Sequence, residues 1–166
     1  MKFEPFLLDR LLNTPDSLTR VDASRWALSM NQVKDSVAHD LEALLNTRTA
    51  YLPQRMQAWR HAAQSVLTFG LMDFVGLSLD NPDHRATICE SIAGAILQHE
   101  PRLKQVVVKL ESSAKLGLGL RFSIHAKLMI NPAVEAVSFD ALLQPNTQRY
   151  AIRQSSRSAE LGRLNG

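Results

Sequence analysis

The chain has 166 residues, of which 45% are hydrophobic and 21% are charged, so it is long enough for one core and too short for two comfortable ones. Its formal net charge is +3, but basic and acidic residues are interleaved along the whole chain, which argues against a dedicated nucleic-acid surface. No window approaches the roughly 20 apolar residues that cross a bilayer, and acids interrupt the apolar N-terminal stretch, unlike in a signal peptide. We therefore expect one cytoplasmic globular domain without direct membrane insertion.

The N-terminal segment, residues 1–28, carries an apolar cluster followed by a polar stretch with a proline, which is typical of a short helical arm on a linker. Its apolar residues are Phe3, Phe6, Leu7, Leu8, Leu11 and Leu12. Such an arm cannot bury its apolar face alone, so we expect it to dock either on its own domain or on a partner.

Two amphipathic patterns follow the arm. Ser29 begins the capping box Ser-Met-Asn-Gln, and the apolar residues after it recur at helical spacing, which predicts a helix that ends near Asn46. A second pattern over residues 52–67 predicts another helix, closed by Phe69 and Gly70.

A third predicted helix ends in an abrupt change of hydrophobic period. Asn81 is its expected N-cap and Pro82 its first residue. Helical spacing of apolar residues continues as far as Glu100-Pro101-Arg102, which we call the Glu-Pro-Arg turn, and a β-branched run follows it. Proline explains the break, because it disfavours the helical conformation of the preceding residue and has no N–H to donate. It does not explain the two charges beside it.

Alternating apolar and polar residues after this turn predict an antiparallel sheet with one face open to water. The predicted strands cover residues 103–111, 120–130, 136–143 and 150–153. Helices followed by strands indicate an α+β fold, with N-terminal helices packed on a small C-terminal sheet. The expected organisation is an arm and linker over 1–28, one domain over 29–153 and a flexible tail over 154–166.

Residues that carry chemistry show no recognised catalytic or metal-binding spacing. The five histidines are His39, His61, His84, His99 and His125. None pairs with another histidine or with the single cysteine, Cys89, at the spacing of a metal site. Apolar neighbours of Cys89 predict a buried thiol in a reducing compartment rather than a reactive one. We expect no catalytic residue, no metal and no cofactor.

Glycoside hydrolysis is the enzymatic alternative, because it requires only two carboxyl groups, one of them protonated. Glu100 is the conceivable acid, with Glu111 or Asp140 as its partner. Arg102 argues against this assignment, since a cation in contact with Glu100 would favour the ionised form. Aromatic residues that stack on sugars are also scarce, at 6% of the chain.

Four segments, taken together, carry a resemblance to a known family. They are LLDRLLN near the N-terminus, DLEALLNTR at 40–48, SVLTFGLMDF at 65–74 and HEPRL at 99–103. In this order they resemble TssE, the family of type VI secretion baseplate subunits related to the small phage baseplate wedge protein of the lysozyme-like family. The set covers most of the chain and is specific, although each segment alone is weak.

The resemblance implies a non-enzymatic wedge component that works with the baseplate subunits TssF, TssG and TssK. It also implies that the subunit offers the sheath subunits TssB and TssC a sheet resembling their own, on which the contractile sheath begins to assemble. In the assembled machine the chain would lie at the cytoplasmic face of the inner membrane.

The resemblance also assigns roles to particular residues. The family's motif falls on Glu100, Pro101 and Arg102, which it implicates in binding the core bundle of the wedge. The other motif positions are Asp40, Leu41, Leu44, Leu45, Asn46, Arg48, Phe69 and Gly70. We expect the leucines to be core residues. For Arg48 the helix dipole is a sufficient structural reason, because it favours a cation at the helix C-terminus. The alternative is that Asn46 and Arg48 organise the Glu-Pro-Arg turn or bind a partner. His39 and Met72 depart from the family pattern.

Two expectations follow for the sheet and for the turn. An antiparallel sheet ends in edge strands that can accept an added strand, unless outward lysines and arginines blunt them. If the turn binds a partner, Glu100→Gln and Arg102→Gln proteins should melt near normally and lose their wedge partners, since an exposed ion pair contributes little to stability.

Overall fold

The computed structural model describes residues 28–49, 58–74, 77–78, 81–111, 120–131, 133–144, 147 and 149–155. The predicted arm, apart from its last residue, and most of the predicted tail lie outside the described residues, so both stay predictions.

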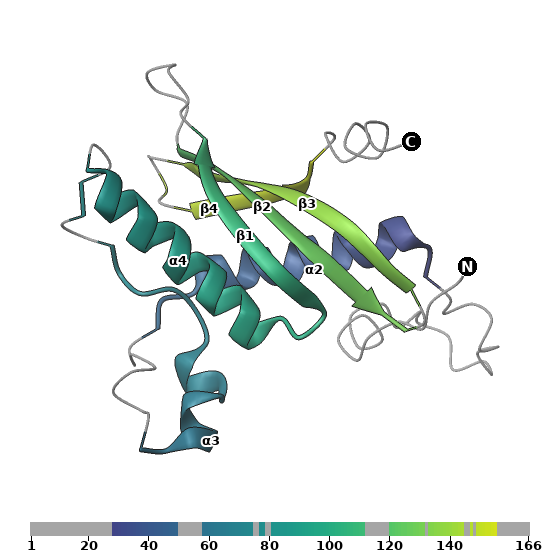
Figure 1. Ribbon diagram of the computed structural model, residues 1–166, viewed down its shortest axis with the longest axis horizontal. Helices are drawn as coiled ribbons and strands as arrows, with labels where there is room; N and C mark the ends of the chain where they lie inside the picture. Colours follow the sequence, from purple (N-terminus) through teal and green to yellow (C-terminus); the bar gives the residue numbers. More distant parts are fainter. Residues whose placement is uncertain are drawn as a thin grey trace.

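The described chain consists of helices followed by a four-stranded antiparallel sheet, which confirms the predicted α+β fold (Figure 1). Its main elements are α2 (Met30–Asn46), α4 (Pro82–His99), β1 (Leu103–Glu111), β2 (Leu120–Ile130), β3 (Ala133–Gln144) and β4 (Arg149–Gln154). The strands lie in the sheet in chain order, each antiparallel to the next. Within the described ranges, no helix is long and apolar enough to span a membrane.

Both long helices begin as the sequence predicts. The Ser29 hydroxyl accepts a hydrogen bond from the Gln32 N–H at 3.3 Å, and the Gln32 side chain accepts one from the Ser29 N–H at 2.8 Å, which completes the capping box. Asn81 caps α4 by accepting from the Asp83 N–H at 2.8 Å, and Pro82 occupies the first turn.

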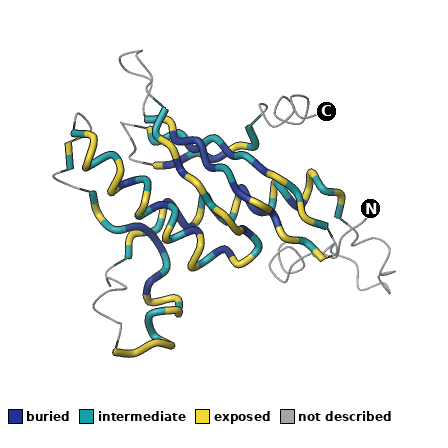
Figure 2. The backbone as a smooth tube through the Cα atoms, viewed as in Figure 1, coloured by how far each residue is buried: buried dark blue, intermediate teal, exposed yellow. Residues whose placement is uncertain are grey.

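The two long helices cover one face of the sheet. Helix α2 packs against β4, α4 packs against β1, and the helices touch one another (Figure 1). Buried residues lie along the strands and along the helices that cover them (Figure 2). The largest fully buried ones are Phe122, Phe139, Leu41, Leu44, Leu45, Leu71, Ile92, Ile96, Leu103, Ile124, Leu128 and Val33. In the part of the chain that the structure describes, no helix covers the opposite face, which we call the open face (Figure 1).

The helix predicted over residues 52–67 is wrong where the structure describes that segment. It contains only the four-residue helix α3 (Arg60–Ala63) and a 3-10 turn over Val66–Thr68. The apolar pattern reaches no core, because Trp59 is 65% exposed and Val66 81% exposed. The α3 segment instead projects from the body of the molecule (Figure 1). Residues 50–57 lie outside the described part.

Strand β1 contains an irregularity that alternation did not predict. Its register against β2 shifts between Lys104 and Val107, where one extra residue is inserted. Gln105, inside this bulge, has a φ of 52°, a left-handed conformation that side chains other than glycine adopt at a cost.

Candidate partner-binding site around the Glu-Pro-Arg turn

The backbone of the Glu-Pro-Arg turn is closed by hydrogen bonds at both ends. The Glu100 N–H donates to the Ile96 carbonyl at 2.8 Å, which ends α4, and the Leu103 N–H donates to the Glu100 carbonyl at 3.1 Å. The Met129 N–H then donates to the Arg102 carbonyl at 2.8 Å, which begins the ladder between β1 and β2. The turn therefore connects α4 to β1 through backbone groups that are hydrogen-bonded at both ends.

The two charges of the turn bind one another. One Glu100 carboxylate oxygen accepts from the Arg102 backbone N–H at 3.2 Å and from the Arg102 Nε at 2.6 Å. The other oxygen accepts from Arg102 Nη2, and the same nitrogen also donates to Asp40 of α2. This bidentate arrangement links three elements, since Asp40 precedes Arg102 by 62 residues.

Burial changes what this ion pair contributes. Glu100 is only 5% exposed, the Arg102 side chain is 12% exposed, and the Asp40 side chain is 35% exposed. Burial lowers the pKa of Arg102, but hydrogen bonds and charges from Glu100 and Asp40 outweigh it and raise the pKa above its ordinary value. The expectation of an exposed, weakly stabilising pair is therefore wrong.

At this site, Pro101 and part of the Asp40 side chain are exposed to solvent. Pro101 is exposed, whereas the guanidinium and carboxylate on either side of it point inward to each other. A partner that binds here would meet the proline ring and the half-exposed Asp40 carboxylate, with the buried pair fixing their geometry. The partner-binding role of Glu100 and Arg102 stays a prediction.

Asn46 binds the edge of the sheet and not the Glu-Pro-Arg turn. Its side-chain amide donates to the Tyr150 carbonyl and accepts from the Tyr150 N–H, each at 2.9 Å. Glu42, one helical turn earlier, accepts from the Ile152 N–H at 3.0 Å. Side chains of α2 thus occupy the outward backbone groups of β4. Sequence reasoning missed Glu42, whose only signal was its position four residues before Asn46.

Replacing Asn46 with alanine is expected to lower the free energy of unfolding by about 1–3 kcal/mol, because it leaves both Tyr150 backbone groups without partners. Urea denaturation measures this loss. The matched control is Asn31→Ala in the same helix, since within the described residues the exposed Asn31 side chain makes no hydrogen bond. Equal stabilities for the two variants would contradict the assigned role of Asn46.

Arg48 and Gly70 lie where two of the sequence motifs meet. Arg48 is exposed and forms an isolated parallel bridge with Leu71, and the Leu71 N–H donates to the Thr47 carbonyl at 2.9 Å. Gly70 permits this approach, because its φ is 116° and a Cβ there would lie 2.5 Å from the Thr47 carbonyl oxygen. Burial raises the pKa of Tyr150 and the charge of Arg48 partly offsets this rise.

Gly70→Ala is expected to destabilise the protein by more than about 1 kcal/mol, since both the positive φ and the Thr47 backbone oppose a side chain. Gly94→Ala in α4 should have the opposite sign and stabilise by roughly 0.5–1 kcal/mol, because its Cβ would meet nothing within 4 Å. Thermal melts of both variants test the pair of predictions. A neutral Gly70→Ala would show that the 47–71 contact is not tight.

The remaining motif residues have structural roles. Leu41, Leu44 and Leu45 are buried in the core, as expected. The Phe69 ring contacts the ring of His99 edge-on, with centroids 5.4 Å apart.

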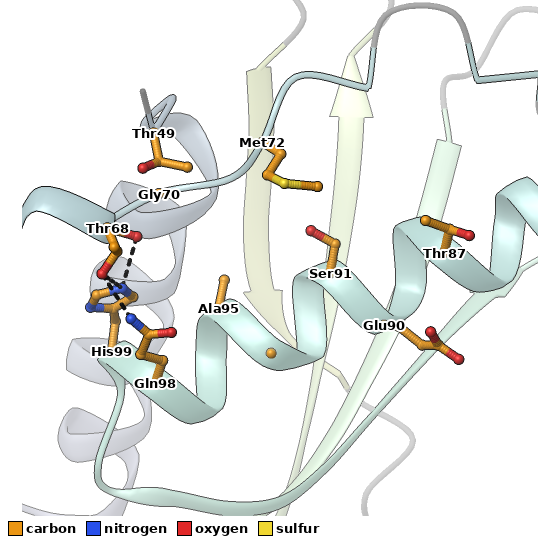
Figure 3. Close-up of a pocket in the computed structure, with 11 residues that line it drawn as sticks. Thr49, Thr68, Gly70, Met72, Thr87, Glu90, Ser91, Ala95, Gln98 and His99 are labelled. Atoms are coloured by element: carbon orange, nitrogen blue, oxygen red, sulfur yellow. Dashed lines mark hydrogen bonds between the residues drawn. The ribbon is translucent and has the colours of Figure 1, made fainter. Parts of the chain in front are cut away.

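A cavity of about 400 Å³ separates α4 from the segment around Gly70 and Met72 (Figure 3). Gln98 donates to the Thr68 hydroxyl at 2.7 Å, and the His99 Nε2 lies 2.9 Å from the Thr68 carbonyl oxygen. Among the described residues that line it, Glu90 is the single carboxylate. These described residues thus offer hydrogen-bonding groups but not the paired carboxylates of a glycosidase.

Glu100 does not meet either carboxylate named as its possible catalytic partner. Glu111 lies at the far end of β1, a nine-residue strand, which places it about 27 Å away, against the roughly 5–10 Å that glycosidases use. Asp140 lies on the open face of β3, opposite Arg153. No group of three metal-ligating side chains occurs within the described ranges.

Cys89 lies in α4 and is half-buried, so the thiol is less buried than the sequence predicted. Partial burial raises the pKa of the thiol, which disfavours the thiolate at neutral pH. That the thiol is unreactive stays a prediction.

The sequence matches one family model, and the fold is similar to a chain of a solved structure. The family model described as "Baseplate wedge protein gp25" matches residues 31–133, which is more than half of the chain. A chain from a solved structure described as "The baseplate complex from the type VI secretion system" is 19% identical, with a TM-score of 0.44, covering 73% of this chain and 95% of that chain. The comparison with curated proteins gave no match.

Proposed function

The chain belongs to the baseplate wedge protein gp25 family, and from this premise we propose that it is a structural wedge component of a type VI secretion baseplate. In this role it works with TssF, TssG and TssK in the cytoplasm, at the inner face of the inner membrane. It also starts assembly of the contractile sheath of TssB and TssC.

The observation that supports this proposal most is the convergence of the sequence motifs. Asp40 of DLEALLNTR binds Arg102 of HEPRL, and Phe69 of SVLTFGLMDF contacts His99 of HEPRL. The backbone contact between Thr47 and Leu71 joins DLEALLNTR to SVLTFGLMDF. Motifs far apart in the chain are thus in contact with one another, and we assign the exposed Pro101 beside Glu100 and Arg102 to binding the core bundle of the wedge.

Sheath assembly is the finer part of the proposal, and the two edges of the sheet differ in a way that favours β1. Outward backbone groups of β4 bind side chains of α2. Alternate residues of an antiparallel ladder bond to the neighbouring strand. The Met129 N–H bonds to Arg102, so the odd-numbered residues of β2 bond to β1. Val108 and Leu110 pair with the even-numbered Ile124 and Phe122, and their backbone groups therefore point away from β2. We therefore assign strand addition to β1.

Within the described residues, no side chain forms a hydrogen bond with the backbone N–H or carbonyl of Val108. At Leu110, by contrast, the Cys89 thiol of α4 faces the backbone. An edge with free backbone groups can template another strand.

The proposed function is tested in the bacterium that carries this chain, with a fluorescent TssB as the reporter. Deleting the gene should abolish sheaths, and the wild-type chain should restore them and co-purify with TssF, TssG and TssK. Normal sheaths in the deletion strain would overturn the proposal.

The competing function, glycoside hydrolysis, is tested directly on purified peptidoglycan. We expect no turnover, because Arg102 binds both the Glu100 carboxylate and the neighbouring Asp40 carboxylate in ion pairs, and Glu100 is buried. Turnover that Glu100→Gln abolishes would restore the enzymatic alternative.

A further inference from the structure

The open face of the sheet carries two lysines directly opposite one another. Lys104 of β1 and Lys127 of β2 are cross-strand partners, and both are exposed; we call them the lysine pair. Like charges in this arrangement destabilise a sheet. Within the described part of the chain neither lysine has an ion-pair partner, whereas Lys34, on the helix-covered side, binds Glu135.

The bulge in β1 is what places Lys104 in this pair. Lys104 and Val107 are three residues apart, so in a regular strand they would point to opposite faces. The extra residue at the bulge puts both on the open face while Leu103 stays buried. A strained Gln105 is retained at that point. The chain therefore keeps an unfavourable backbone conformation and an unfavourable charge contact together.

Exposed apolar side chains lie on both sides of the lysine pair. Val107, 49% exposed, is the cross-strand partner of His125 on one side. Met129 and Val134, 44% and 57% exposed, face each other on the other side. His125 and Met129 are four residues apart on β2, so the two apolar rows lie about 13 Å from one another. The open face thus presents an apolar, a basic and a second apolar row in succession.

We propose that this face binds an acidic amphipathic helix of another protein chain. A helix rises about 1.5 Å per residue, so apolar residues at i and i+7 or i+8 span roughly 11–12 Å and match the two apolar rows. Carboxylates at i+3 or i+4 then lie over the lysine pair, whose mutual repulsion they neutralise. Laying a helix on this face adds a third layer to the two layers that the described part of the chain forms.

Charge and composition favour an acidic helix of another protein over a nucleic acid and over the chain's own N-terminal residues. A nucleic acid would leave Val107, Met129 and Val134 without apolar contacts. The chain's own residues 1–12 balance Glu4 and Asp9 with Lys2 and Arg10, so they bring no net negative charge to the lysine pair.

The experiment places a photo-crosslinking amino acid at Ala136, the exposed cross-strand neighbour of Lys127, in the full chain produced in its own bacterium. Mass spectrometry identifies the crosslinked peptide, which should have the apolar–acidic–apolar pattern. The same peptide, made synthetically, should bind the purified protein, and Lys127→Glu or Lys104→Glu should weaken its binding at least tenfold. Arg60→Glu, an exposed reversal in the distant α3, should change it less than twofold (Figure 1).

A second measurement separates binding from folding. Lys104→Glu replaces a like-charge contact with an opposite-charge contact, so its melting temperature should equal or exceed that of the wild type. The proposal is overturned if no crosslink forms or if the crosslinked segment is residues 1–12 or a second copy of this chain. It is equally overturned if duplex DNA or phosphatidylglycerol vesicles displace the peptide, or if both lysine reversals weaken binding less than threefold.

Discussion

Replacing Ile92 with alanine is expected to lower the free energy of unfolding by about 2–5 kcal/mol. Ile92 is fully buried midway along α4, between Ile88 and Ile96, on the face that packs against β1. Truncation removes apolar contacts and leaves a cavity that a helix held at both ends closes poorly. In a urea titration, the loss should appear as a lower midpoint concentration of urea, while the slope of the unfolding free energy against urea concentration stays unchanged.

Leu97→Ala is the matched control for this prediction. Leu97 lies on the same helix but is 46% exposed, so its truncation should cost well under half as much. An Ile92→Ala protein as stable as Leu97→Ala would mean that α4 is not packed on β1 and that its apolar face serves a partner instead.

Local signals were sufficient to predict most of the fold. Ser29 with Gln32 and Asn81 with Pro82 predicted the helix starts, because capping depends on residues three or fewer positions apart. The β-branched run after the Glu-Pro-Arg turn predicted β1. Alternation predicted the bounds of β2, since one buried face imposes a period of two. The same reasoning failed over residues 52–67, because a helical period predicts a helix only when a core receives its apolar face.

Long-range pairing explains what the sequence could not predict about the candidate site. Asn46 and Tyr150 are 104 residues apart, so nothing local distinguishes an amide that binds a strand edge from one that binds a partner. The bulge was equally hidden, because its left-handed residue is Gln105 and not a glycine. The lysine pair follows from that bulge, and it could be found only once the register between β1 and β2 was known.

Arg102→Ala is expected to lower the free energy of unfolding by about 3–5 kcal/mol, because it leaves the Glu100 carboxylate buried without its cation. This replaces the near-normal melting temperature expected for an exposed pair. The single variant cannot separate folding from partner binding, since a destabilised protein also fails to co-purify.

A double variant, Glu100→Leu with Arg102→Met, makes that separation. Replacing a buried ion pair with apolar residues of similar volume is often neutral, and Asp40, at 35% exposed, can turn its carboxylate to water. The melting temperature should therefore return to near the wild-type value. If the charged pair fixes the surface around Pro101 for the wedge core, the refolded double variant still fails to co-purify with TssF and TssG and supports no sheaths. Normal co-purification would mean that the Glu-Pro-Arg turn only closes the fold between α4 and β1.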